Sequence, residues 1–360
     1  MMKKIICLLL LIIMHFHTVT AENYAFLISA GEATADADSC NPEFWYDLYL
    51  SYEYLLLWEQ YDSTNVYVFY GDGTDFNTTE DRYKKELHNW GQITDYNNSY
   101  STMYSVFSSL DNVITDNDNV FIYWVAGHAM KTIANDDDSY IAEITHNNHY
   151  EVVNKTQLMN LINSITHYNK RKIFWMTCYS GAIGEGAINP LNNKTVLLTS
   201  SSSNAESEGF NDLDRLMHSG FNYAVYTLST GMFPHGLPYN VSSVCPYLAH
   251  NTDSLLSINE LLYCMITFTY LATWINYPCE LLPSLFDVGN ISNKLYVGEQ
   301  KHLKNVTIDS NSSYWVDRME VTNVIFDNNL DINMQINKHL IINKSTFVPR
   351  GTTLQVKQTN

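Results

Sequence analysis

Basic residues are scarce in this chain of 360 residues: 20 Lys and Arg stand against 38 Asp and Glu, so the formal net charge at pH 7 is −18. Such a surplus of acidic groups repels phosphate backbones and anionic lipid headgroups, which argues against nucleic-acid binding and membrane-surface binding. Proline and glycine are also sparse, with 8 and 15 residues, which excludes collagen-like and low-complexity chains. Because 46% of the residues are hydrophobic, the composition predicts a globular protein with a substantial core.

Long hydrophobic runs are missing except at the amino terminus. Two lysines precede an apolar run over 5–16, and the small residues at 19–21 complete the three-part pattern of a secretory signal peptide. That run is too short to span a bilayer comfortably, and the longest later apolar region, 255–275, is interrupted by polar residues. We therefore expect residues 1–21 to be removed. The mature protein, with 18 basic and 38 acidic residues, is expected to have no membrane span and to be exported to an extracellular, periplasmic or endomembrane space.

Cysteine is rare: the chain has six, and one of them, Cys7, belongs to the expected signal peptide. An odd number in an oxidising compartment implies at least one thiol outside the disulfides, or an intermolecular bridge. The sequence leaves open three pairings of the other four, or a role for them as buried small side chains. The five mature cysteines are Cys40, Cys178, Cys245, Cys264 and Cys279.

Short apolar runs alternate with segments of helical periodicity through the first 280 residues or so. This alternation predicts a mainly parallel sheet covered by helices on both faces, with right-handed connections. From about residue 290 the helical period stops and short β-type runs recur, with a pattern of stacked strand–turn units over 332–356. The sequence thus predicts an α/β, three-layer αβα domain over 22–285 and a small all-β module over 290–360. We expect strands at 24–28, 66–70, 120–125, 172–176 and 195–199, and helices near 44–59, 80–90, 103–114 and 155–167.

Two reactive residues follow consecutive strands of this predicted sheet. His128 comes just after the strand 120–125, and Cys178 just after 172–176. Because catalytic groups collect at the carboxyl ends of parallel strands, and consecutive strands usually pair, we expect both residues at one edge of the sheet. A thiolate nucleophile beside a histidine that exchanges protons forms a Cys/His dyad. Backbone N–H groups of Ala129 and Cys178 would then hold the oxyanion.

Each of these residues taken alone has a plainer interpretation. A cysteine at the end of a buried strand is more often packed than catalytic, and a histidine after a strand more often caps or faces solvent; their joint placement favours catalysis. We expect no cofactor and no metal, because nucleotide-binding glycine motifs are missing and His146 and His149 lack cysteine partners. The serines 200–203 are expected to line the substrate groove, and the three aspartates 136–138 to form a solvated loop.

The order of these landmarks resembles the legumain-type cysteine peptidases, which are the asparaginyl endopeptidases and their transamidase relatives, within the caspase-like fold. The resemblance implies that Cys178 is the nucleophile, His128 the general base and acid, and Asn41 the residue that orients the histidine. It covers about residues 23–283 and rests on the strand 24–29, the helix start at 41–52, the strand and Gly-His at 120–128, and the strand and Cys-x-Ser-Gly at 172–181.

Three positions depart from the family pattern and bear on specificity. Ala129 stands where the family has Gly after the histidine, Glu43 where it has a specificity-pocket Arg, and Met176 where it has Glu. The resemblance places Glu43 and Met176 in substrate binding. A carboxylate in a narrow pocket favours Lys or Arg at the residue before the scissile bond, P1, over Asp. The alternative is that Glu43 only stabilises the amino terminus of a helix.

Together these features favour an exported cysteine endopeptidase that cleaves a peptide or protein substrate through a Cys178 thioester. Water gives hydrolysis and a second amine gives transpeptidation or transamidation, an alternative that the sequence leaves open. The rival interpretation is a degenerate peptidase-like binding or adhesion protein, which Glu43 and Ala129 favour and the intact Cys178 and His128 oppose. Natural substrate, zymogen processing and oligomeric state stay open.

Overall fold

A computed structural model gives the fold of the chain. It describes most of the first 240 residues and a series of short segments beyond them. Residues 1–20 of the predicted signal peptide, Asn41 and the acidic loop 136–138 lie outside the described residues. These are 21–31, 42–131, 140–146, 149–185, 192–207, 209–211, 217–237, 256–258, 261–262, 264–265, 284–287, 296–297, 300–304, 307–308, 312–322, 325–326, 331–342 and 353–358.

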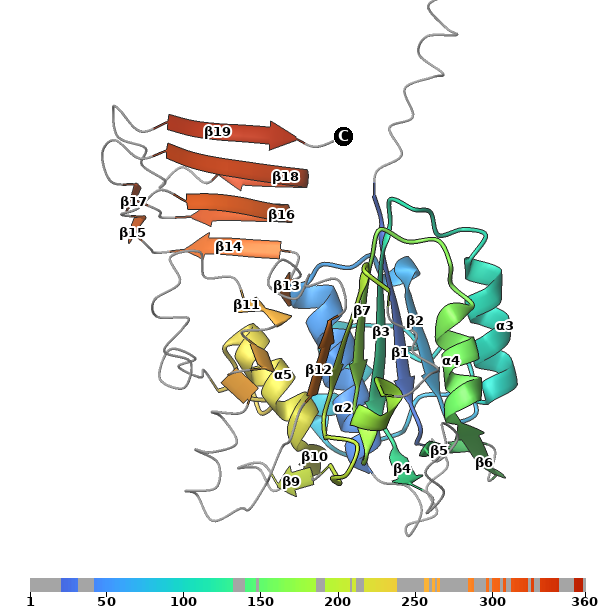
Figure 1. Ribbon diagram of the computed structural model, residues 1–360. Helices are drawn as coiled ribbons and strands as arrows, with labels where there is room; N and C mark the ends of the chain where they lie inside the picture. Colours follow the sequence, from blue (N-terminus) through green and yellow to red (C-terminus); the bar gives the residue numbers. More distant parts are fainter. Residues whose placement is uncertain are drawn as a thin grey trace, which may run out of the picture.

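A six-stranded sheet with the order β12-β8-β7-β3-β1-β2 forms the centre of the molecule (Figure 1). Every neighbouring pair is parallel except β12 and β8, which are antiparallel. The five predicted strands are therefore confirmed, whereas β12 was not predicted, because a run of four residues is too short to show a period. The strands are β1 (Asn23–Ser29), β2 (Val66–Tyr70), β3 (Asn119–Ala126), β7 (Lys170–Trp175), β8 (Thr195–Thr199) and β12 (Ser284–Asp287).

Helices cover both faces of this sheet, which confirms the predicted three-layer αβα arrangement. Helices α2 (Pro42–Glu53) and α5 (Gly220–Thr230) lie on one face, and α3 (Tyr100–Leu110) and α4 (Lys155–Asn163) lie on the other (Figure 1). Strand β1 is buried along its whole length because alternate residues enter opposite cores. Leu27 packs in the core on the α2 side and Phe26 in the core on the α3 side.

The helices begin where polar side chains satisfy the first N–H groups. Ser99 accepts from the N–H of Thr102 at the start of α3, and Ser219 accepts from Asn222 at the start of α5. Asn154 and Gln157 bind each other's backbone as a capping box at the start of α4. A buried or half-buried N-cap of this kind contributes about 1 kcal/mol.

The prediction of a helix over 80–90 is wrong. The segment instead forms two short 3-10 turns, η3 (Asp81–Tyr83) and η4 (Lys85–His88), separated by Lys84 in an extended conformation. Tertiary contacts override the helical pattern here, because the Tyr83 ring is fully buried and Arg82 binds Glu53 of α2. The region predicted as one helix over 44–59 contains two helix types. The α-helix α2 ends at Glu53, and a π-helical turn, η1 (Tyr54–Trp58), follows it.

A small antiparallel sheet follows β3 directly and was not predicted. Its strands are β4 (His128–Lys131), β5 (Tyr140–His146) and β6 (His149–Asn154), in that order. Its buried side, which includes Ala142 and Ile144, continues the core on the α4 face of the main sheet. His128 is thus the first residue of a paired strand, and its backbone direction is fixed by β5.

All described residues beyond 290 lie in strands, as expected for the β module. Strands β14, β16, β18 and β19 pair in parallel, and so do β15 and β17, so that the chain forms stacked coils (Figure 1). The division into two domains stays a prediction. The strands are β14 (Gln300–Lys304), β15 (Thr307–Ile308), β16 (Ser312–Thr322), β17 (Ile325–Phe326), β18 (Asp331–Ile342) and β19 (Thr353–Gln358), with β13 (Tyr296–Val297) paired to β11 (Leu256–Ser257) and β9 (Gly209–Asn211) paired to β10 (Met217–Ser219).

Candidate active site

The ends of β3 and β7 bring His128 and Cys178 to the same edge of the sheet. The two strands are parallel neighbours, with Trp124 opposite Trp175, and the N–H of Met176 donates to the Trp124 carbonyl at 2.9 Å. His128 follows Trp124 by four residues and Cys178 follows Trp175 by three. The segments also stay in contact beyond the strands. The expectation that these two strands pair is therefore confirmed.

Glycine is required between β3 and His128. A methyl group on Gly127 would lie 2.7 Å from the indole nitrogen of Trp124 and 2.9 Å from the Ala30 methyl, closer than such atoms approach. It would lie 3.7 Å from a methyl of Thr177, the residue just before Cys178. The backbone just before His128 is thus packed tightly against the ends of β1 and β7.

His128 lies beside the first turn of α2 and is exposed to solvent. Its ring centroid is 5.3 Å from that of Phe44, whose carbonyl accepts a hydrogen bond from the Ser29 hydroxyl at 3.1 Å. The end of β1, the start of α2 and His128 therefore meet at one point. The local sequence that begins α2 contributes directly to the surroundings of the histidine.

Cys178 forms no disulfide and is partly exposed. The N–H of Ser207 donates to its sulfur at 3.4 Å, and the Cys178 thiol donates to the Ser207 carbonyl at 3.6 Å. The N–H favours the thiolate and the carbonyl favours the protonated thiol, so Ser207 can bind the group in both states. The Ser207 hydroxyl in turn lies 3.8 Å from the sulfur of Met176, which is only 4% exposed. Ser207 therefore joins the thiol to the residue that was predicted to bind substrate.

The residue after Cys178 has a strained backbone. Tyr179 adopts the left-handed conformation with φ 55° and ψ 21°, which is uncommon for a residue other than glycine. Its N–H donates to the Ala205 carbonyl at 2.8 Å, and its hydroxyl donates to Glu206 at 3.0 Å. The hydrogen bond to Glu206 raises the pKa of the Tyr179 hydroxyl. These contacts hold the turn that presents the thiol.

The serines 200–203 support this turn and do not line a groove as predicted. Ser200, Ser201 and Ser203 are buried, because their hydroxyl and backbone groups satisfy the polar groups of the turn. The Ser200 hydroxyl donates to the Thr177 carbonyl at 3.0 Å, and the N–H of Ser180 donates to the Ser201 hydroxyl at 3.1 Å. The serine run is therefore part of the scaffold under Cys178.

A buried hydrogen-bond chain links the Cys178 turn to the small sheet. The Trp175 indole donates to the Tyr140 hydroxyl at 3.0 Å, and that hydroxyl lies 2.6 Å from the hydroxyl of Thr177. Thr177 also contacts the Cys178 carbonyl at 3.1 Å. Burial raises the pKa of Tyr140 well above its ordinary value, so the phenol stays protonated and available as a donor.

We expect Gly181→Ala to disrupt the site. An added Cβ would lie 2.5 Å from the backbone nitrogen of Ser203 and 2.8 Å from the carbonyl carbon of Ser202. Because both atoms belong to the backbone, the loop must move, at a cost of about 2 kcal/mol for overpacking. Thermal unfolding should show this loss, and any peptide hydrolysis should fall at least tenfold. Gly91→Ala is the matched control, since nothing lies within 4 Å of its added Cβ; equal behaviour of the two variants would contradict the prediction.

A fully buried polar cluster, missed by the sequence analysis, lies between α2, α5 and β3. One oxygen of Asp47 lies 2.9 Å from Nδ1 of His218, and the other accepts from the N–H of Ser219 and the amide of Asn222, both at 2.9 Å. Nε2 of His218 lies 2.9 Å from the Tyr83 hydroxyl. Asp47 and His218 are 0% exposed, so the cluster cannot touch substrate.

This cluster, called the Asp47 cluster below, also reaches the strand that carries His128. The Asn222 amide donates to the Val125 carbonyl of β3, and its oxygen accepts from the Tyr123 hydroxyl. The cluster consists of Asp47, Tyr83, Tyr123, His218, Ser219 and Asn222 and joins α2, η3, β10 and α5 to the end of β3. Its role is to fix the layers that bring the two reactive residues together.

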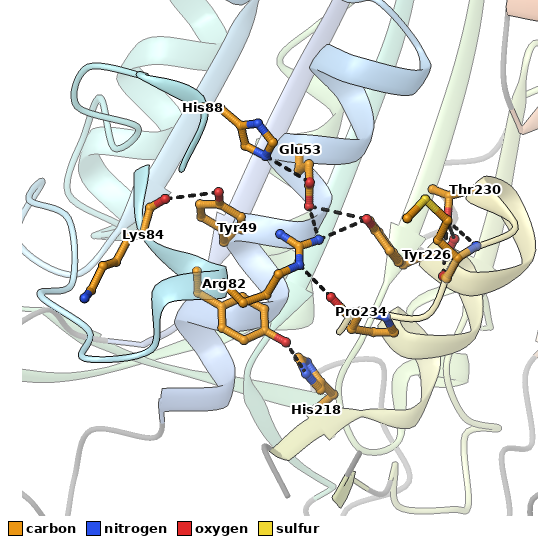
Figure 2. A network of polar contacts seen from close by, with 11 residues as sticks. Tyr49, Glu53, Arg82, Lys84, His88, His218, Tyr226, Thr230 and Pro234 are labelled. Carbon is orange, nitrogen blue, oxygen red and sulfur yellow. Dashed lines mark hydrogen bonds and ion pairs between the residues drawn. The ribbon is translucent and has the colours of Figure 1, made fainter. Parts of the chain in front are cut away.

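A second polar network lies beside it and is shown in Figure 2. Arg82 bonds to Glu53 at 2.5 Å and to the Tyr226 hydroxyl at 3.1 Å, and its Nε donates to the Pro234 carbonyl at 2.7 Å. Nε2 of His88 lies 3.0 Å from the other oxygen of Glu53. Burial opposes the charge of Arg82, but Glu53 and Tyr226 hold its pKa above the ordinary value. The network ties η3 and η4 to α2 and to the segment after α5.

The remaining predicted residues are placed as follows. Glu43 is 9% exposed in the first turn of α2, next to Phe44, where a carboxylate also suits the helix dipole. Ala129 is buried in β4, opposite Ala142. Because Asn41 lies outside the described residues, its orienting role stays a prediction, as do the pocket role of Glu43 and the oxyanion role of Ala129.

The described segments show no metal cluster and no membrane-spanning helix. No group of three or more His, Cys, Asp or Glu side chains in them is arranged to hold a metal ion. Nor is any helix in this part of the chain long and apolar enough to cross a bilayer. His146, one of two histidines weighed as zinc ligands, instead lies 3.1 Å from Glu151.

Comparisons with known proteins find likeness only among solved structures. No family model matches the chain, and no curated protein matches it. The chain is similar to caspase-1 from Spodoptera frugiperda, with a TM-score of 0.42 and 9% identity over 74% of this chain and 87% of that one. It is also similar to protein GSU0716 from Geobacter sulfurreducens, with a TM-score of 0.40 and 9% identity over 74% and 92%. Likeness at this level assigns no role to any residue.

Proposed function

We propose that this chain is a cysteine peptidase of the caspase-like type that acts through Cys178 and His128. The observation that carries the proposal is the placement of a partly exposed cysteine and an exposed histidine at the carboxyl ends of adjacent parallel strands. The strained, heavily buttressed turn at Tyr179 supports it, because strain of this kind is concentrated at functional sites.

The mechanism follows from the chemistry of the two groups. The Cys178 thiolate attacks the scissile carbonyl carbon, and the oxyanion that forms is held by backbone N–H groups at Cys178 and Ala129. His128 gives its proton to the leaving amine as the C–N bond breaks, which leaves a thioester. Water, deprotonated by His128, then releases the acid, or a second amine forms a new peptide bond. Hydrolysis and transamidation thus differ only in the group that attacks the thioester.

Export of the protein is part of this proposal. The three-part signal pattern at 1–21 supports it. Cys264, which is buried, is disulfide-bonded, and disulfides are typical of oxidising compartments. Cys178 is not in a disulfide, as a nucleophile requires.

The P1 preference tests the proposed pocket role of Glu43. A carboxylate in the pocket attracts a cationic side chain and repels an acidic one, so we expect Lys or Arg at P1 to be cleaved at least tenfold faster than Asp. In Glu43→Arg that order should reverse. Matched peptides that differ only at P1 provide the measurement. An unchanged preference in the variant would make Glu43 a structural residue of the α2 start.

A peptide library, incubated with the mature protein with and without a thiol alkylator, tests the function itself. Alkylator-sensitive cleavage is expected, and adding an amine nucleophile divides the outcomes, because a transamidase then yields ligated products. Absence of cleavage and of ligation, in a protein whose Cys178 nevertheless reacts with the alkylator, would favour the rival interpretation as a peptidase-like binding protein.

A further inference from the structure

The small sheet β4-β5-β6 presents His128 on a face that carries a second ionisable group. Along β4, Ala129 is buried while His128 and Met130 on either side of it are exposed. Along β5, Ala142 and Ile144 are buried while Glu143 between them is partly exposed. Residues directly opposite each other in an antiparallel pair share a face, and His128 is opposite Glu143.

This pairing puts a carboxylate within reach of the imidazole. Cβ atoms of such cross-strand partners are ~5 Å apart, and the Glu side chain adds three rotatable bonds. The register of this pairing is well defined, because a slip of β4 by one residue would bury His128 and expose Ala129.

The third strand supplies a partner that holds the carboxylate. Tyr150 of β6 is opposite Thr145, two residues along β5 from Glu143, so its long side chain reaches Glu143 diagonally. Partial burial raises the pKa of the Tyr150 hydroxyl to about 12, with a smaller contribution from a hydrogen bond to Glu143. Tyr150 therefore stays a donor at neutral pH and orients the carboxylate on the face that carries His128.

The other ionisable groups near His128 are engaged elsewhere or belong to the dyad. Cys178 comes from the turn after β7, and Glu43 comes from the first turn of α2, where it is buried. On β4 itself, the Lys131 ammonium donates to the Ser203 carbonyl and to the Asn204 side chain, at 3.2 and 3.0 Å. Glu206, beside the nucleophile turn, binds Tyr179. Among the described residues, Glu143 is thus the carboxylate paired directly across from the histidine.

We propose that Glu143 is a positioning residue for His128: its carboxylate accepts a hydrogen bond from one imidazole N–H and fixes the orientation of the ring. The proposal rests on the proposed function, in which His128 must hold a proton until the amine leaves. No atom of Glu143 takes part in bond making. Its contribution is the orientation of the histidine, as carboxylate partners of imidazoles provide in other sites.

NMR at a fixed pH tests the pair without relying on peptide cleavage. Histidine-labelled Cys178→Ala protein is compared with and without Glu143→Gln, and the His128 signals are assigned by their loss in His128→Ala. Removing the carboxylate takes away the acceptor of an imidazole N–H, so the ring nitrogen signals of His128 should shift. Asp116→Asn removes an equal charge at a site that is 71% exposed, and it should leave the His128 signals unchanged. Identical His128 signals with and without Glu143 would overturn the proposal.

Kinetics separate positioning from a merely structural effect. Glu143→Gln should lower kcat about tenfold with little change in KM. Glu143→Asp should recover part of the rate, and Tyr150→Phe should lose less than Glu143→Gln. A Glu143→Asp variant that is no faster than Glu143→Gln would overturn the positioning role. If the wild type cleaves no peptide, the proposed function fails, while the NMR comparison still decides whether Glu143 acts on His128.

Discussion

Cys178→Ala is expected to abolish peptide hydrolysis, with a loss of at least about 10³-fold, because the variant has no atom that can form the thioester. His128→Ala should lose a comparable factor, since the leaving amine then departs unprotonated. Neither change should unfold the protein. Cys178 is partly exposed on a turn and His128 is exposed at the start of β4, so we expect stability within about 1 kcal/mol of the wild type.

Three measurements test this prediction. Turnover of the best library peptide gives the loss, thermal unfolding confirms the fold, and mass spectrometry after mild alkylation identifies the reactive thiol. The His128→Ala variant should also alkylate more slowly at neutral pH, because the imidazolium no longer favours the thiolate. Wild-type turnover in either variant would remove the dyad from the mechanism and leave Cys178 as a packed thiol.

Asp47→Ala is expected to cost about 3–5 kcal/mol of the free energy of unfolding, a large part of what a domain has. The substitution removes both acceptor oxygens from a site that is 0% exposed. His218, Ser219 and Asn222 then each keep a buried donor without its acceptor, and an unsatisfied buried donor costs about 1–3 kcal/mol. Because the same cluster binds the Val125 carbonyl, the end of β3 should loosen as well.

Denaturant unfolding measures this loss, with Asp116→Asn, an exposed site, as the control that should stay within about 0.5 kcal/mol. If Asp47→Ala does not fold, Asp47→Asn keeps one acceptor oxygen and should show an intermediate loss. A near-neutral Asp47→Asn together with a near-neutral Asp47→Ala would mean that the cluster does not hold the layers together.

The sequence alone predicted the features that depend on local pattern. The strands at 66–70 and 195–199 have the same bounds in the structure, because fully buried strands of a parallel sheet read as continuous apolar runs. The common edge of His128 and Cys178 followed from a rule of topology, which holds here since β3 and β7 are neighbours.

What the sequence did not predict depends on contacts between distant segments. Asp47 and His218 are separated by 171 residues, and Asp47 sits in an aromatic helix whose pattern gives no sign of a buried charge. The serine run 200–203 was expected in the groove because loops at that end of the sheet converge on the site, whereas its hydroxyls satisfy polar groups of the Cys178 turn. The left-handed Tyr179 has no sequence signal at all, since glycine or asparagine normally marks such a position.

The parallel coils near the carboxyl terminus have a consequence for how such a chain can vary. Gln300 pairs with Arg318, Ser312 with Ile332 and Asp331 with Thr353, so the backbone returns to the same column after 18 to 22 residues. A stack of this kind can change its length in steps of one turn, because each turn of chain touches only the turns directly above and below it. Inserting or deleting one whole turn would change the height of the stack by a single step of ~4.8 Å, while every other pairing keeps its register. Insertions of any other length would have to be absorbed in the connections between strands.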